Sequence, residues 1–206
     1  MILSASQPYF APYPGFFDKI LRSDIFVILD RVQFPRGTTW VSRNRFKSDQ
    51  GAMWMTIPVR KKGLGLQRID QVRIDHEGRW LRKHIASLKN SYRNAPYFRD
   101  HFPFMEEIFL KMPERLVDLN FEIIRYIMRN MFIPTRVMLL SDLDIDARGD
   151  RLIIEICKRA GATTFLAQGG AKKFMDRALY SEGGIMLEFF KPVRPVYPQL
   201  WGDFIP

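Results

Sequence analysis

The first thirty residues alternate between short apolar runs and one stretch rich in proline and glycine. Ile2–Ser6 is a short apolar run, and residues 7–15 are dense in proline and form a shaped loop. Phe16–Arg22 carries apolar residues at helical spacing, and Asp24–Asp30 is a continuous apolar run between two aspartates. Such an uninterrupted run is typical of a parallel strand buried on both faces. The order strand, helix, strand therefore predicts an α/β fold with a mostly parallel sheet and flanking helices.

The same periodicities predict further elements along the chain. Strands are expected at Met53–Val59, Ile69–Ile74, Val137–Leu140, Thr163–Ala167 and Ile185–Phe190, and helices at Trp80–Tyr92, Pro103–Leu110, Glu114–Asn130 and Asp150–Ala160. No internal repeat or linker divides the 206 residues, which are enough to bury a core. A single domain over residues 1–206 is the expectation.

Composition narrows the class of protein. Hydrophobic residues make up 47% and charged residues 26% of the chain, which is ordinary for a globular domain. One cysteine, Cys157, excludes an intramolecular disulfide and a thiolate zinc cluster, and its apolar neighbours predict a buried inert thiol. With three histidines, a metal site of His/Cys type is not expected. Because no stretch approaches the roughly 20 apolar residues of a membrane span, a cytoplasmic location is expected.

The formal net charge of +10 attracts anions such as nucleotides, sugar phosphates, RNA or an anionic lipid surface. It does not choose among them. The basic residues are scattered along the chain, so a plain solvated basic face is an equal alternative.

The first candidate site is the loop that contains Gln7, Pro8, Pro12 and Gly15. It follows the first strand, and open α/β sheets bind ligands at the carboxyl ends of their strands. The helix that follows offers free backbone amides to an anion. A tight connection without a ligand is the alternative, because no Walker lysine motif or G-x-G-x-x-G is present.

The second candidate stretch runs from Asp30 to Asn44. Asp30 ends an apolar strand, where its carboxylate can accept hydrogen bonds from a ligand or pair structurally with an arginine. Trp40 offers a stacking face, Arg43 a planar donor fork for phosphate or carboxylate, and Asn44 an amide that both donates and accepts. Together they predict recognition of a polar, sugar-bearing ligand.

The third candidate is His84, on the predicted helix Trp80–Tyr92. Its position on the apolar side of that helix is typical of a core histidine bonded to a backbone carbonyl. General-base work is the competing interpretation.

These polar residues also follow the order of a known family. The blocks are Gln7-Pro8, Asp30-x-x-Gln33-Phe34, Trp40-x-x-Arg43-Asn44, Trp80-x-x-Lys83-His84, Tyr92-x-x-Ala95-Pro96-Tyr97-Phe98 and Tyr197-x-Gln199. Their order resembles the WbqC-like proteins over essentially the whole chain. Members commonly occur in gene clusters for bacterial O-antigen and other surface polysaccharides, and the resemblance implies transfer of glycine to an amino sugar.

The resemblance thus implies an aminoacyl (glycyl) or acyl transferase that forms an amide on an amino sugar, nucleotide-linked. An aminoacyl-tRNA is one donor that the basic surface would tolerate. His84 is the expected base, with Asp30 orienting or competing with it. The expected binding residues are Gln7, Tyr13, Gly15, Gln33, Trp40, Arg43, Asn44, Lys83, Tyr92, Tyr197 and Gln199.

Two other functions stay open. The opening also loosely resembles Rossmann-like, nucleotidyltransferase-like and ATP-dependent ligase domains, in which a loop glycine such as Gly15 lets phosphates approach the helix. ATP would then be a co-substrate, and no other cofactor is expected. That loop usually carries histidines, whereas this chain has Tyr13 and Phe16. A non-enzymatic basic protein that binds RNA or polysaccharide precursors is the third class.

The chain departs from the family pattern at two places. Leu166-Ala167-Gln168-Gly169-Gly170 stands where members usually have Tyr-Leu-Ser-Gly, and Pro206 is the last residue where members continue into a segment resembling Ser-Ile-Leu-Asp. The chain is thus either naturally short or lacks a completing helix.

Overall fold

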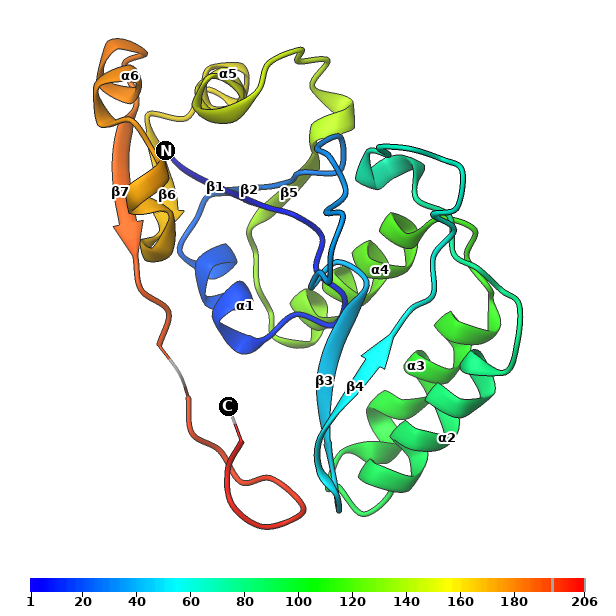
Figure 1. The fold of residues 1–206 in the computed structure, drawn as a ribbon. Coiled ribbons are helices and arrows are strands. Elements are labelled where there is room, and N and C mark those ends of the chain that lie inside the picture. Colours follow the sequence, from blue (N-terminus) through cyan, green and yellow to red (C-terminus); the bar gives the residue numbers. More distant parts are fainter. Residues whose placement is uncertain (194, 206) are drawn as a thin grey trace. The chain divides into compact units, whose positions relative to one another are not determined.

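The strand Ile2–Ser6 (β1) lies at the centre of a five-stranded sheet in the computed structural model, which describes residues 1–193 and 195–205 (Figure 1). The strand order is β5-β2-β1-β6-β7, and every neighbouring pair is parallel. The predicted α/β class and parallel sheet are therefore confirmed. In chain order this is the arrangement 3-2-1-4-5, which is the Rossmann order 3-2-1-4-5-6 without its last strand.

The chain divides into two compact units. Unit 1 contains the five-stranded sheet and comprises Met1–Pro8, Tyr13–Val32 and Arg125–Arg194. Unit 2 comprises Tyr9–Pro12, Gln33–Ile124 and Pro195–Pro206. The expectation of a single domain stays a prediction.

Helices cover both faces of the sheet of unit 1 (Figure 1). On one face Phe16 packs edge-on against Phe26, with 5.3 Å between ring centroids. On the other face Leu3, Val27 and Phe165 pack with the apolar side of α5. The elements are β1, α1 (Pro14–Leu21), β2 (Ile25–Ile28), β5 (Arg136–Leu139), η2 (Leu140–Asp142), α5 (Gly149–Ala160), β6 (Thr164–Gln168), η3 (Gly169–Phe174), α6 (Arg177–Glu182) and β7 (Met186–Phe190).

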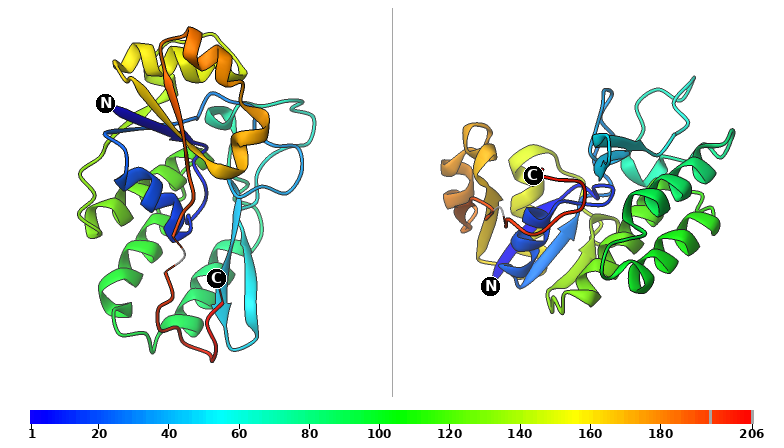
Figure 2. Two further views of the ribbon diagram at one scale, coloured as in Figure 1. Left: turned by 90° about the vertical axis from the view of Figure 1, so that its left-hand side faces the viewer. Right: turned by 90° about the horizontal axis from the view of Figure 1, so that it is seen from below.

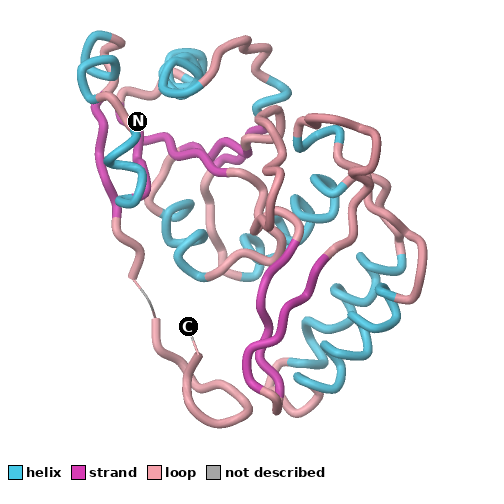
Figure 3. Tube along the Cα trace, viewed as in Figure 1, coloured by secondary structure: helices cyan, strands magenta, loops and turns pink. Residues whose placement is uncertain are grey.

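Unit 2 is built from a β-hairpin and helices (Figure 3). Its two strands are antiparallel, with Arg45 opposite Trp54 and Arg43 opposite Thr56. The helices α2 and α3 run side by side (Figure 2). The elements are β3 (Arg43–Ser48), β4 (Gly51–Thr56), η1 (Ile69–Gln71), α2 (Trp80–Tyr92), α3 (Phe98–Leu110) and α4 (Leu116–Asn130), whose last residues from Arg125 belong to unit 1.

Most predicted elements are confirmed within a few residues, but the strand Ile69–Ile74 is wrong. That segment begins with the 3-10 helix η1, in which the Gln71 side chain accepts a hydrogen bond from the Arg68 backbone at 3.0 Å. Ile69 and Val72 are both fully buried although they lie three residues apart. A strand would point them to opposite faces, whereas a 3-10 turn places them on the same side.

Candidate functional site

The candidate residues of unit 1 lie where β1 and β6 end. Gln7 directly follows β1 and is half-buried, and Tyr13 directly precedes α1. The Tyr13 hydroxyl accepts a hydrogen bond of 3.1 Å from the side-chain amide of Gln168, the last residue of β6. Between β1 and β6 the strand order changes direction, and open α/β sheets bind ligands at such a point. We call the carboxyl ends of β1 and β6 the switch-point edge.

Gly15 has a packing role at this edge. A Cβ atom on Gly15 would lie 2.5 Å from the Tyr13 ring and 2.7 Å from the Cβ of Pro192. Real Cβ atoms do not approach other atoms so closely, and Gly15 thereby admits Pro192 against the start of α1.

Asp30 is buried, with 3% of its surface exposed, and its Oδ1 accepts a 3.0 Å hydrogen bond from the backbone N–H of Ser141. That bond holds the first turn of η2 next to the end of β2. In this structure Asp30 therefore joins two segments of unit 1.

Unit 2 contains a cluster of two tryptophans and two arginines, which we call the tryptophan–arginine face. Trp40 and Arg43 are the members that the sequence predicted. The guanidinium of Arg43 lies 4.0 Å from the Trp54 ring centre, and that of Arg45 lies 6.0 Å away. The Trp40 and Trp54 rings are 5.5 Å apart, and the two residues are 44% and 48% exposed. Exposed indole rings beside arginines can stack on a sugar or a base and hold an anion.

Trp54 and Arg45 were missed from the sequence. The signal was present in the alternation of residues 43–48 and 51–56, which places Arg43, Arg45 and Trp54 on one face of the hairpin. The charged pattern of β3 does not have the apolar run that would identify it as a strand.

Asn44 supports this face from behind. Its side-chain amide donates to the carbonyls of Phe10 and Ala11, at 3.1 and 2.7 Å, and its Oδ1 accepts from the backbone N–H of Arg45 at 2.7 Å. The amide nitrogen of Asn44 thus binds the loop and its oxygen binds β3, so Asn44 orients the start of β3.

His84 lies on α2 next to the hairpin of unit 2. Its Nε2 lies 2.8 Å from the carbonyl oxygen of Thr56, and its ring packs edge-on against Trp80. Because a carbonyl can only accept, Nε2 carries the proton of the neutral ring and Nδ1 has the free lone pair. Burial lowers the pKa of His84 below 6.5, an effect that the hydrogen bond to Thr56 partly offsets. The ring is therefore neutral at pH 7.

Two further predicted residues lie on α2. Lys83 is exposed, whereas Tyr92 is half-buried and its hydroxyl accepts a 3.0 Å hydrogen bond from the backbone N–H of Lys47. Burial is the main cause that raises the pKa of Tyr92. Tyr92 thus holds the hairpin against α2.

The last segment of unit 2 contains Tyr197 and Gln199. The Gln199 side chain both donates to and accepts from the backbone of Ile205, at 3.0 Å each, and the Tyr197 ring packs edge-on against Phe204. Lys47 donates to the carbonyls of Gly202 and Asp203. These contacts fix the shape of the segment.

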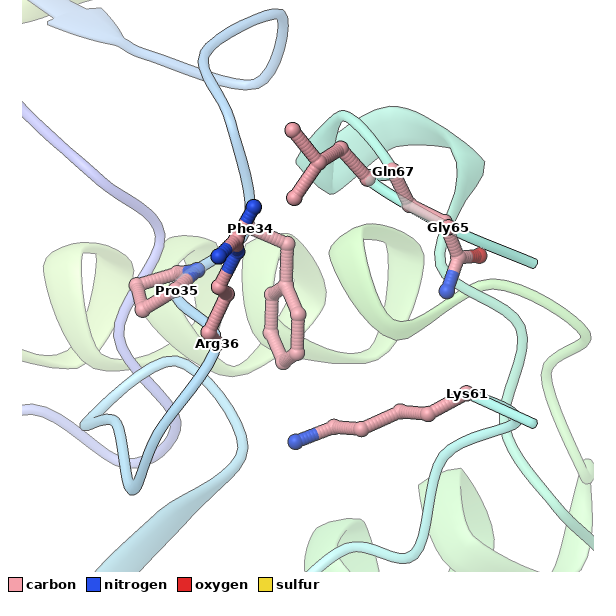
Figure 4. Close-up of a pocket in the computed structure, with 7 residues that line it drawn as sticks. Phe34, Pro35, Arg36, Lys61, Gly65 and Gln67 are labelled. Atoms are coloured by element: carbon pink, nitrogen blue, oxygen red, sulfur yellow. The ribbon is translucent and has the colours of Figure 1, made fainter. Parts of the chain in front are cut away.

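Gln33 is exposed and forms an isolated bridge with Arg68. Beside it is a hollow of about 350 Å³, which the sequence analysis did not predict (Figure 4). The ammonium of Lys61 lies 5.2 Å from the centre of the Phe34 ring in its wall. Its lining is Phe34, Pro35, Arg36, Lys61, Gly65, Leu66 and Gln67.

Gln7, Tyr13, Gly15 and Asp30 belong to unit 1, and the other predicted site residues belong to unit 2. Within residues 1–193 and 195–205, no group of three His, Cys, Asp or Glu side chains could hold a metal ion. None of the described helices is long and apolar enough to cross a membrane.

The comparisons with known proteins agree with the family resemblance. The WbqC-like protein family matches residues 7–206. Rv1507c, an uncharacterized protein of Mycobacterium tuberculosis (strain ATCC 25618 / H37Rv), is 31% identical over 203 residues, which cover 97% of this chain and 87% of the relative. No solved structure matches the chain. With nearly its whole length matched, the chain belongs to the WbqC-like protein family.

Proposed function

We propose that this protein is an aminoacyl (glycyl) or acyl transferase that forms an amide on a nucleotide-linked amino sugar. The reaction would belong to surface-polysaccharide assembly in the cytoplasm. The observation that carries the proposal is the neutral, oriented imidazole of His84. The class of substrate is the one that the resemblance to the WbqC-like family implies, and the family match over residues 7–206 supports that choice.

His84 has the properties that a general base for amide formation needs. The Thr56 carbonyl fixes its tautomer through a 2.8 Å bond, and its lowered pKa keeps Nδ1 unprotonated at neutral pH. Such a base takes a proton from the sugar amine as the amine nitrogen bonds to the acyl carbon. The bond between the acyl carbon and its carrier then breaks, and the imidazolium returns the proton to the departing oxygen or sulfur. The Thr56 carbonyl orients the ring, and the expected role of Asp30 in orienting or competing with the base stays a prediction.

The tryptophan–arginine face supports recognition of the sugar substrate. A sugar or nucleobase can stack on Trp40 or Trp54, and Arg43 and Arg45 can pair with phosphates. We assign Gln7, Tyr13 and Gly15 to ligand binding at the switch-point edge. We also keep the assignment to substrate binding for Gln33, Asn44, Lys83, Tyr92, Tyr197 and Gln199. Of these, Asn44, Tyr92 and Gln199 also support neighbouring backbone through their hydrogen bonds.

The test is mass spectrometry of amino-sugar nucleotides incubated with the protein, glycine, ATP and charged tRNA. The expected product is heavier by one acyl residue. His84→Gln should retain the melting temperature and lose roughly 100-fold or more of the turnover, the scale of acid–base catalysis. A destabilised but fully active His84→Gln variant would remove the base assignment.

An ATP-dependent ligase is the second candidate, favoured by the 3-2-1-4-5 strand order that is common in nucleotide-binding domains. In that case ATP is required and pyrophosphate is released with the amino acid. Omitting ATP from the same incubations separates the two reactions. Salt-sensitive binding of RNA with no product in any mixture would instead favour a binding protein.

A further inference from the structure

Lys19 is a buried cation in unit 1 that no proposal above uses. It is 6% exposed and lies in α1, with its ammonium 5.6 Å from the centre of the buried Phe26 ring. Its Nζ donates a 2.8 Å hydrogen bond to the carbonyl of Ala5 in β1. Lysine is rarely buried without a partner of opposite charge, so this placement calls for a reason.

The orientation of β1 tells where this ammonium lies. The carbonyls of Ile2 and Ser6 accept from Asp24 and Leu29, on the side of β2. The carbonyl of Met1 accepts from Thr164, on the side of β6. Since carbonyls alternate along a strand, the Ala5 carbonyl faces β6.

β1 and β6 separate before they reach Ala5. Their ladder pairs Ile2 with Thr164 and Leu3 with Phe165, and then stops. Both strands continue with their other neighbours, β1 as far as Ser6 with β2 and β6 as far as Gln168 with β7. The Lys19 ammonium therefore reaches a carbonyl beyond the end of the β1–β6 ladder, at the switch point of the sheet.

The ammonium has unused donors at this position. In the described part of the chain its hydrogen-bond acceptor is the Ala5 carbonyl, and no carboxylate pairs with it. A lysine has three N–H donors, so two of them are left for a ligand or water. Burial lowers the pKa of Lys19 to about 8, as expected for an ammonium that no carboxylate pairs with.

We propose that Lys19 is the anion-binding group of the switch-point edge and holds a phosphate oxygen of a ligand beyond the end of the β1–β6 ladder. Lys19 lies one turn after Gly15 on the same face of α1, and its side chain leans toward the start of that helix. The first turn of α1 has no side-chain cap. Pro14 has no N–H and the Phe16 N–H donates to the Tyr13 carbonyl, so the Gly15 N–H is the donor of this turn that can bind a second phosphate oxygen. The Tyr13–Gln168 hydrogen bond lies at the same edge, and Tyr13 is 43% exposed, so it can move without disturbing the core.

Pyrophosphate and a nucleoside diphosphate, UDP, are suitable probes, with sodium chloride at equal ionic strength as the reference. In the wild type both should raise the melting temperature. Lys19→Met keeps the apolar stem and removes the charge. Relief of the buried charge offsets the loss of the bond to the Ala5 carbonyl, so the variant should still fold, and it should bind both probes roughly tenfold or more weakly. The control is Lys158→Met, which replaces an exposed lysine of the same unit. This variant should bind both probes as the wild type does.

NMR of the Lys19 side chain gives a second readout that needs no variant. Its pKa should rise from about 8 when pyrophosphate is added, because an anion stabilises the charged form. An unchanged pKa, or an equal affinity of wild type and Lys19→Met, overturns the proposal and leaves Lys19 as a structural donor to Ala5. Because the proposal concerns phosphate binding alone, it stands whether or not the protein transfers an acyl group.

Discussion

The guanidinium of Arg43 lies 4.0 Å from the centre of the Trp54 ring, although the residue directly opposite Arg43 in the hairpin is Thr56. Arg43 is thus held in a diagonal contact with Trp54 on the next strand. Such a contact keeps the arginine extended over a flat surface and limits its rotamers before a ligand arrives. The face is therefore pre-organised for binding.

Trp54→Ala should weaken the binding of a sugar nucleotide by roughly tenfold, because stacking on an aromatic ring contributes about 1–3 kcal/mol. Isothermal titration calorimetry measures the loss. The matched control is Met53→Ala, since Met53 is also exposed but points to the other face of β4. Equal losses in both variants would exclude Trp54 as a stacking surface.

Arg43→Ala should likewise weaken binding more than Arg60→Ala, because Arg43 belongs to the tryptophan–arginine face whereas Arg60 lies in a plain basic run. The affinities of both variants at two salt concentrations test this. If both lose the same amount and the loss disappears at high salt, diffuse charge attraction explains the binding.

The pH dependence of transfer follows from His84. Its folded pKa is lowered below the ordinary 6.5, so the base is active at pH 7 and is lost as pH falls through that lower pKa. The unfolded chain takes up this proton first, near 6.5, and the contribution of His84 to stability therefore also decreases as pH falls. A profile of kcat/KM against pH and urea unfolding at pH 5 and 7 measure the two effects. An activity that rises below pH 6 would contradict the assignment.

Gly15→Ala should lower the melting temperature by several degrees, because the new methyl group meets the Tyr13 ring and Pro192 at 2.5 and 2.7 Å. Overpacking of this kind costs about 1–3 kcal/mol. Gly37→Ala is the control, since no atom lies within 4 Å of the position its Cβ would take. Thermal unfolding of the two variants should therefore differ, and an equally stable Gly15→Ala would show that Pro192 can move away.

Cys157 should not react with iodoacetamide in the folded protein. It is fully buried, and burial raises its pKa to about 12, so the reactive thiolate is scarce at neutral pH. Mass spectrometry should show full labelling in urea and almost none without it. Rapid labelling of the native chain would mean that α5 opens locally.

The elements that could be predicted from the sequence are those whose own residues carry the pattern, whatever segments pack against them. The run from Ile25 to Ile28 is apolar throughout, so it identifies itself as a buried strand, and α2 begins and ends where its periodicity predicted. β3 was missed because its burial depends on what covers it. Lys47, for instance, is buried by a segment more than 150 residues away. No local pattern contains that information.

The candidate site shows the same division. Arg43 and Trp40 were found because arginine and tryptophan are suited to binding wherever they are exposed. Lys19 was missed because, in the sequence, a lysine near the end of a short predicted helix is typical of a surface residue. The folded structure reveals that Lys19 is 6% exposed and that its ammonium bonds to the Ala5 carbonyl of β1. The role of Asn44 also depended on the loop at Phe10 and Ala11, which lies more than 30 residues earlier.

The central position of β1 has a consequence for synthesis on the ribosome. β1 leaves the exit tunnel before the other strands of its sheet, but its second neighbour, β6, ends at Gln168. Until that residue emerges, one edge of β1 has no strand to pair with, and the nascent chain exposes unpaired backbone N–H and C=O groups that other chains can capture. Pairing between segments so far apart in the sequence forms slowly, so this edge of β1 stays open to capture by other chains until β6 has been made.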